Sequence, residues 1–304
     1  MAPSPTGALH LGNLRTFLIT WAIARRGGWR LLMRIEDLDG PRVKPESERS
    51  VLETLEWVGM DWDGPVLRQS DDLAPYRKGM RRLTERRLAF PCALSRSEIE
   101  AAASAPHAGD HESCYPRALR PDVRPTDFQD EQTNWRFVAD DGVVDIDDLV
   151  AGHQERSPAS TVGDFVIWTR RGQPAYQLAV VVDDHRQGVT DVIRGDDLLD
   201  SAARQIQLAD ALGLEWRPRY WHLPLVLGPD GRRLAKRHGD TRVVSYREAG
   251  VTPARLVGLI AAWSGVADQP EPMTSHEFAA RFDIANLSRN PVTFTTEDDA
   301  WLRG

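Results

Sequence analysis

Two short segments of the sequence carry side chains that suit chemistry on phosphate groups. The first, residues 2–13, holds His10 and Asn13 at the start of an expected helix. A helix N-terminus presents unpaired N–H groups and partial positive charge, so it favours an anion such as a phosphate. Two side-chain donors there could stabilise charge that develops on a phosphoryl oxygen. Taken alone, such a segment is more often an ordinary loop with a solvated histidine.

The second segment is a cationic loop that follows a turn at residues 229–231. Its basic side chains crowd into a few positions: Arg232, Arg233, Lys236 and Arg237. Clustered guanidinium and ammonium groups could hold a triphosphate. The segment alone favours the alternative interpretation, a solvated basic turn.

The elements that must position these segments alternate between helices and strands. Apolar spacing predicts helices at residues 13–26, 46–58, 72–89 and 197–212, and strands at 31–35, 164–168, 176–182 and 190–193. Such alternation predicts an α/β fold with a parallel sheet and crossover helices. Asp183, Asp184 and His185 are expected to end a strand at the carboxyl edge of that sheet. Beyond residue 240 the chain reads as helical, with Thr252 and Pro253 opening one helix.

The residue composition changes around residue 90, where Pro, Asp and short strand-like segments become frequent. We therefore expect an α/β domain in two halves, residues 1–89 and 164–227. An inserted α+β domain is expected at 90–163. The cationic loop and a small helical region are expected at 228–304.

Composition excludes several protein classes. The net charge is −7, from 38 Lys and Arg against 45 Asp and Glu, so a nucleic acid must be met by local basic patches. Candidates for phosphate contacts are the basic residues between 77 and 87 and Arg117, Arg120 and Arg124, unless the first group is only a solvated helix face. No apolar stretch approaches the ~20 residues of a membrane span. The chain has only two cysteines, which excludes a disulfide scaffold, so we expect a cytoplasmic protein. We also expect a monomer.

Together the two segments resemble the paired nucleotide signatures of the class I aminoacyl-tRNA synthetases. The first signature matches His10-Leu11-Gly12-Asn13, and the second matches Arg233-Leu234-Ala235-Lys236-Arg237. Further stretches resemble the glutamyl branch of that class, at residues 2–7, 34–39, 176–179, 181–185, 188–195 and 234–239. The resemblance runs from residue 1 to about residue 300, and it implies that residues 1–89 and 164–227 form a Rossmann-like catalytic domain. It implies that the chain is a ligase, that ATP is a substrate, and that Mg²⁺ is held mostly by phosphate oxygens and water.

The resemblance also implies roles for individual residues. Glutamate would be bound near Ala2, Ser4, Glu36, Tyr176 and Arg194. Arg194 can grip a carboxylate through two parallel hydrogen bonds, and Glu36 can accept from the substrate ammonium. An internal salt bridge is an equally open interpretation for these two residues. ATP would be bound by His10, Gly12, Asn13, Arg233, Leu234, Ala235, Lys236 and Arg237. Of these, His10 and Asn13 would serve the α-phosphate and Lys236 the leaving phosphates.

Chain length separates members of the glutamyl branch. Full-length members carry a further anticodon-binding region, which we do not expect here because the chain stops at Gly304. The short members, the glutamyl-Q tRNA(Asp) synthetases, attach glutamate to the queuosine base of the tRNA(Asp) anticodon, and residues 194–198 resemble theirs. The expected partners are thus L-glutamate and queuosine-containing tRNA(Asp). Two alternatives stay open: a shortened glutamyl-tRNA synthetase that charges a 3′ end, and a non-catalytic synthetase-like tRNA-binding regulator.

The sequence departs from the family pattern at two places. A substrate-binding arginine usually stands two positions before the residue that is Ala2 here, so we expect the natural start to lie upstream of Met1. Some short members hold structural zinc at positions that match Cys92, Leu94, Tyr115 and Leu119. Leucine cannot ligate zinc, so we do not expect zinc, and Cys92 should be a buried apolar residue. An improvised zinc site from Cys92, His107, His111 and Cys114 is the weaker alternative.

Overall fold

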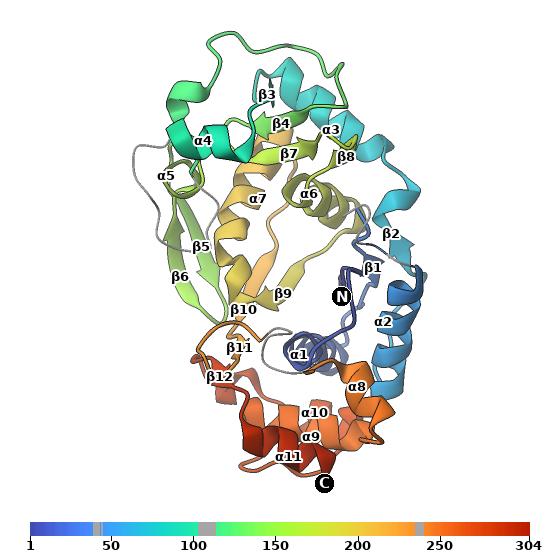
Figure 1. Cartoon of the computed structure of the whole chain (residues 1–304). Coiled ribbons are helices and arrows are strands. Elements are labelled where there is room, and N and C mark those ends of the chain that lie inside the picture. Colours follow the sequence, from blue (N-terminus) through green and yellow to red (C-terminus); the bar gives the residue numbers. More distant parts are fainter. Residues whose placement is uncertain (39–42, 44, 103–113, 235–239) are drawn as a thin grey trace. The chain divides into compact units, whose positions relative to one another are not determined.

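The structure is a computed structural model of residues 1–304, and it describes all of them except 39–42, 44, 103–113 and 235–239 (Figure 1). The described residues form two compact units. The first unit comprises Met1–Ser70, Ile193–Asp197 and His222–Gly304, and the second comprises Asp71–Val192 and Leu198–Trp221. The expected domain boundaries at residues 89, 163 and 227 divide the chain differently and stay a prediction.

The first unit combines two parallel strand pairs with helices from both ends of the chain. Strand β1 (Arg34–Ile35) pairs with β2 (Leu67–Arg68), and β11 (Val226–Leu227) pairs with β12 (Val292–Thr293). Its helices are α1 (Leu11–Gly27), α2 (Pro45–Val58), α8 (Val243–Glu248), α9 (Pro253–Trp263), α10 (Ser275–Arg281) and α11 (Thr296–Arg303). Helix α1 packs on α10, and α9 contacts α2, α10 and α11. The short turns η2 (Gln69–Asp71) and η6 (Ile284–Asn286) complete the set.

Local signals explain where these helices begin and end. Helix α1 buries Leu14, Leu18 and Trp21 on one face, and it ends at Gly28, whose φ of 65° is the left-handed conformation that glycine adopts without strain. Helix α9 begins after Thr252, whose side chain accepts a hydrogen bond from the Arg255 amide. Both predicted helices are therefore confirmed, with their expected end and cap.

The second unit contains an antiparallel four-stranded sheet in the order β3-β4-β7-β8. These strands are β3 (Ala89–Cys92), β4 (Asn134–Phe137), β7 (Val166–Thr169) and β8 (Gln173–Pro174). A separate hairpin joins β5 (Val144–Asp148) to β6 (Gly152–Arg156). The helical elements are α3 (Ala74–Glu85), α4 (Arg96–Ala102), η3 (Arg117–Leu119), α5 (Pro158–Thr161), α6 (Tyr176–Gln187) and α7 (Leu199–Leu212). Helix α6 packs against α3 and α7.

Two strands belong partly to each unit. Strand β9 (Asp191–Gly195) pairs with β10 (Arg219–Leu223), and the turn η4 (Asp196–Leu198) follows β9. The α/β class is confirmed at the level of mixed helices, parallel pairs and antiparallel strands. The finer description stays a prediction: a Rossmann-like sheet split by an insertion, followed by a helical stem-contact region, without an anticodon-binding domain. No helix in the described part of the chain combines the length and apolar character that crossing a bilayer demands.

One predicted strand is wrong, because residues 176–182 form the first turns of helix α6. The apolar β-branched run at 180–182 favours a strand locally, but periodicity cannot separate a buried strand from a helix buried on several sides. The helix continues to Gln187 and ends at Gly188, whose φ is 66°. Asp183, Asp184 and His185 therefore lie in its last turns. Asp183 is buried there and accepts a hydrogen bond from the Tyr76 hydroxyl at 2.7 Å.

The long basic helix predicted at 72–89 is shorter than expected. Helix α3 ends at Glu85, Arg87 has a φ of 57°, and Ala89 already pairs with Phe137 in the sheet. The chain must leave the helix to reach this strand pairing. Arg86 and Arg87 consequently fall outside the helical face that carries the exposed side chains of Lys78 and Arg81.

Candidate active site

His10 caps the N-terminus of α1 with its own ring. The Nδ1 atom accepts a hydrogen bond from the Asn13 amide at 3.3 Å. A Cβ on Gly12 would lie 3.1 Å from Cε1 and 3.2 Å from Nδ1 of this ring, so glycine at that position lets the imidazole lie across the first turn. Because Nδ1 accepts, the neutral ring carries its proton on Nε2 and can donate from there.

The electrostatic surroundings keep His10 neutral near pH 7. Burial lowers the pKa of His10 to about 4, and the positive charge of Arg233 acts in the same direction. Within the described residues, the Gly12 amide N–H has no hydrogen-bond acceptor, as is usual in the first turn of a helix. The Nε2–H of His10 and this amide are thus two donors at the positive end of α1. That arrangement suits a phosphate oxygen.

The cationic loop begins beside this helix end. Leu234 is 1% exposed, and its amide donates to the Val226 carbonyl at 3.0 Å, which anchors the loop in the core of the first unit. Arg233 pairs through Nη1 with Oδ2 of Asp197 at 2.5 Å. Ala235, Lys236 and Arg237 lie outside the described residues, so their predicted contacts with ATP stay predictions.

The segment after the loop returns to the first motif. The Leu11 amide donates to the Thr241 carbonyl at 3.1 Å, and the Val243 amide donates to the Leu9 carbonyl at 2.8 Å. His10 and Arg242 form an antiparallel bridge between these hydrogen bonds. Two motifs from opposite ends of the sequence are therefore neighbours in the first unit.

The predicted glutamate-binding residues at the start of the chain lie beside β1. The Arg34 amide donates to the Met1 carbonyl and the Glu36 amide to the Pro3 carbonyl, each at 3.0 Å. These bonds place the backbone around Ala2 and Ser4 along the strand that leads to Glu36. Glu36 accepts a hydrogen bond from Nη2 of Arg34 at 3.2 Å, so the internal ion pair left open by the sequence exists for this residue.

Arg194 is the other buried member of the predicted glutamate site. It lies in β9, is 9% exposed, and donates through Nε to Nε2 of His222 at 3.0 Å. Tyr176 opens helix α6 in the second unit and is 40% exposed. Its relation to Arg194 and Glu36 stays a prediction. No role for His222 is expected from the sequence, although a histidine among the aromatic residues of strand β10 (Arg219–Leu223) is itself a signal of a buried polar contact.

The four positions that matched a zinc site do come together, as an apolar cluster. Leu94 and Leu119 pack against Cys92 and Tyr115, with Phe90 and Ile99 in the same cluster. The Tyr115 hydroxyl donates to the Leu119 carbonyl at 3.0 Å. Cys92 is buried, as expected. Zinc needs four ligands and leucine offers none, so these residues do not fit the metal.

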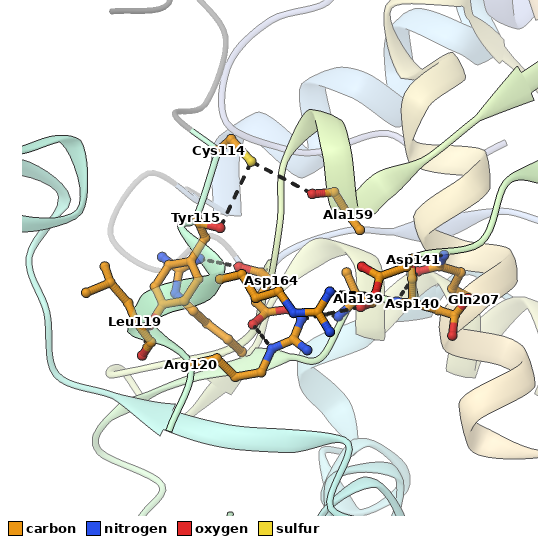
Figure 2. A network of polar contacts seen from close by, with 12 residues as sticks. Cys114, Tyr115, Leu119, Arg120, Ala139, Asp140, Asp141, Ala159, Asp164 and Gln207 are labelled. Carbon is orange, nitrogen blue, oxygen red and sulfur yellow. Dashed lines mark hydrogen bonds and ion pairs between the residues drawn. The ribbon is translucent and has the colours of Figure 1, made fainter. Parts of the chain in front are cut away.

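The improvised zinc site cannot be traced, since His107 and His111 lie outside the described residues. Cys114 lies in a polar network with Tyr115 and Asp164, shown in Figure 2, and its sulfur approaches the Ala159 carbonyl at 3.9 Å. Burial and the charge of Asp164 raise the pKa of the Cys114 thiol. A raised pKa disfavours the thiolate that zinc binds.

We expect the purified protein to contain less than about a tenth of an equivalent of zinc, because two of the required thiolates are leucine side chains. Elemental analysis by mass spectrometry measures this directly. The double variant Leu94→Cys/Leu119→Cys is the positive control, since both positions adjoin Cys92 and Tyr115. Near-stoichiometric zinc in the unaltered protein would contradict the expectation and support the cluster of Cys92, His107, His111 and Cys114.

Among the described residues, one surface group has the composition of a metal site. Asp145, His153 and Glu155 stand on the β5–β6 hairpin with ligand atoms within 4.8 Å of one another, and all three are exposed. A hydrogen bond to Asp147 and the neighbouring carboxylates raise the pKa of His153. Such a pattern is typical of charged side chains on the solvent-exposed surface of a hairpin.

One predicted tRNA contact is an internal contact instead. Figure 2 shows Arg120 turned toward Asp164, to which it donates from Nε at 2.7 Å and Nη2 at 2.6 Å. Asp164 is 1% exposed and also accepts from the Ala139 amide at 2.9 Å. A buried carboxylate requires such pairing, so Arg120 stabilises the fold and is not a free cation for phosphate.

The comparisons with known proteins determine the family of the chain. Residues 1–301 match the family model of the class I tRNA synthetases (E and Q), catalytic domain. The chain belongs to this family. As a class I synthetase, it is an aminoacyl-tRNA synthetase-type ligase.

Two curated relatives and one solved structure illustrate the similarity. The synthetase is 45% identical over 317 residues to the Glutamyl-Q tRNA(Asp) synthetase of Symbiobacterium thermophilum, covering 100% of this chain and 97% of that protein. It is 34% identical to the glutamate–tRNA ligase of Pelobacter propionicus, with 99% and 64% covered. A solved glutamate tRNA ligase from Elizabethkingia meningosepticum, crystallised with its amino acid, shares 29% identity with a TM-score of 0.80, with 99% of this chain and 67% of that chain covered.

Proposed function

We propose that this synthetase activates L-glutamate with ATP and transfers the glutamate to the queuosine base of the tRNA(Asp) anticodon. The observation that carries the proposal is the 45% identity, over the whole chain, to a protein named Glutamyl-Q tRNA(Asp) synthetase. Identity to the glutamate–tRNA ligase of Pelobacter propionicus is 34%. Both substrates of the proposed reaction, ATP and tRNA, are cytoplasmic, so we infer a cytoplasmic location.

The first step is adenylyl transfer. A carboxylate oxygen of glutamate attacks the α-phosphorus of ATP, a new P–O bond forms, and the bond to pyrophosphate breaks. No covalent bond to the enzyme forms, so positioning and charge stabilisation supply the catalysis. The Nε2–H of His10 and the Gly12 amide would donate to an α-phosphate oxygen at the end of α1.

The cationic loop would bind the leaving phosphates. Arg233 and Lys236 would bind the β- and γ-phosphates, and Mg²⁺ would shield the same oxygens, held mainly by phosphate and water. Arg233 is paired with Asp197, which holds its guanidinium near the His10 ring whose pKa its charge lowers. Arg233 would therefore meet the triphosphate close to the helix end that binds the α-phosphate.

Glutamate would be held beside β1 and β9. Arg194 would bind a carboxylate through parallel hydrogen bonds, Glu36 would accept from the ammonium, and Tyr176 would donate through its hydroxyl. Ala2 and Ser4 would form the floor of this site along the first residues of the chain. In the second step, a queuosine hydroxyl attacks the glutamyl-adenylate and AMP leaves.

We expect glutamate-dependent exchange of labelled pyrophosphate into ATP in the absence of any tRNA. The reason is that this chain holds the groups proposed for activation, apart from the arginine expected upstream of Met1. Aspartate and glutamine, which change the length or the charge of the side chain, serve as matched controls and should give background exchange. Absence of exchange with glutamate would favour the non-catalytic tRNA-binding alternative.

A further inference from the structure

A buried histidine lies next to the arginine proposed to bind glutamate. His222 belongs to β10 and is 1% exposed. Its Nε2 lies 3.0 Å from Nε of Arg194 in the neighbouring strand β9. The contact thus joins two side chains whose backbones are held side by side in one sheet.

The chemistry of the two groups determines the direction of this hydrogen bond. A guanidinium only donates, so Nε of Arg194 donates and Nε2 of His222 accepts. An imidazole that accepts through Nε2 is neutral and carries its proton on Nδ1. His222 is therefore an uncharged acceptor for a charged donor, buried with it.

An uncharged acceptor has a consequence that a carboxylate would not have. Other arginines of this unit pair with carboxylates, as Arg34 does with Glu36 and Arg233 with Asp197. Those partners compensate the arginine charge. His222 is neutral in this hydrogen bond, so this contact orients Arg194 and itself adds no negative charge beside the guanidinium.

Orientation matters because the guanidinium is planar. A carboxylate gripped by two parallel hydrogen bonds must lie in the plane of the guanidinium. Fixing Nε fixes that plane, since all three nitrogens share it. The two strands supply the rigid frame that such preorganisation requires.

We propose that His222 is a positioning residue for substrate recognition: it sets the plane of Arg194 so that this arginine grips a carboxylate of glutamate. The inference rests on the proposed function, in which Arg194 binds glutamate. His222 acts through Arg194 and takes no part in the transfer of the adenylyl group.

The test compares two replacements of His222 in pyrophosphate exchange. In His222→Gln, the amide oxygen can accept from Arg194, whereas His222→Leu offers no acceptor. We expect His222→Leu to raise the KM for glutamate about 10- to 100-fold, the range expected for a lost hydrogen bond to a charged group. The KM for ATP should stay within about twofold, and His222→Gln should recover most of the loss.

The surface variant His153→Leu is the matched control and should leave both KM values unchanged. An unchanged glutamate KM in His222→Leu, or equal damage in His222→Gln and His222→Leu, would overturn the inference. If the unaltered enzyme shows no glutamate-dependent pyrophosphate exchange, the result would instead contradict the proposed function.

The hydrogen bond can also be tested in the unaltered protein. This test needs neither an activity assay nor a variant that must fold. Nitrogen-15 NMR of the histidine rings reports which ring nitrogen carries the proton. We expect His222 to be the Nδ1–H tautomer at neutral pH. A proton on Nε2 of His222 would contradict the inference whether or not the enzyme is active, because that nitrogen could not accept from Arg194.

Discussion

Replacement of Lys236 by alanine is expected to lower the turnover number for glutamate-dependent pyrophosphate exchange by about 10²- to 10³-fold. The ammonium group would contact the leaving phosphates, where negative charge builds as the bond to the α-phosphorus breaks. An interaction that strengthens in the transition state affects turnover more than substrate binding, so the glutamate KM should change much less.

The ends of the cationic loop support this expectation, although Lys236 itself lies outside the described residues. Leu234 is anchored in the core on one side, and Thr241 pairs with Leu11 at the start of α1 on the other. The described residues on either side of 235–239 are therefore held in the unit whose helix end would bind the α-phosphate through His10 and Gly12.

The matched control is Lys78→Ala, an exposed lysine on α3, tested in the same assay without tRNA. It should leave exchange near the level of the unaltered enzyme, because it removes a lysine of the same charge elsewhere. A near-normal turnover in Lys236→Ala would remove this lysine from the mechanism. Equal losses in both variants would point to a general effect of lysine removal.

The sequence predicts those parts of the fold that local rules determine. Helix α1 and its end at Gly28, and the cap of α9 at Thr252, follow from residues within one or two turns. Helix α6 was missed because its apolar, β-branched run fits a buried strand as well as a helix enclosed by α3 and α7. Only the tertiary packing distinguishes the two.

In the candidate site, too, some features follow from the local sequence and others depend on tertiary packing. The residue types at His10, Asn13 and Arg194 indicate phosphate and carboxylate chemistry. Their partners did not follow from spacing, because a contact such as Arg194 with His222 depends on the pairing of two strands far apart in sequence. The ion pair of Glu36 with Arg34, by contrast, is local, because residues two apart in an extended segment lie on the same face.

The second large effect concerns the acceptor. If glutamate goes to the queuosine base, the attacking group is a hydroxyl on that modified base, and the terminal adenosine of the tRNA takes no part. We therefore expect transfer to tRNA(Asp) that contains queuosine and no transfer to the same tRNA without it. Exposed cations of α3, such as Lys78 and Arg81, could grip a stem by its phosphates, which gives affinity but no base selectivity.

The alternative enzyme, a synthetase that charges a 3′ end, would require a different tRNA substrate. It would use tRNA(Glu), ignore queuosine, and require an intact terminal adenosine. The two activities share every step through the glutamyl-adenylate, so pyrophosphate exchange cannot separate them. Only the identity of the attacking hydroxyl does.

The most direct measurement follows labelled glutamate into purified queuosine-containing tRNA(Asp) whose 3′ end has been trimmed. Our account predicts that the trimmed tRNA accepts glutamate as well as the intact one. It also predicts that tRNA(Glu) and unmodified tRNA(Asp) stay unlabelled. Efficient labelling of tRNA(Glu), abolished by removal of its terminal adenosine, would contradict the account and identify the chain as a charging enzyme.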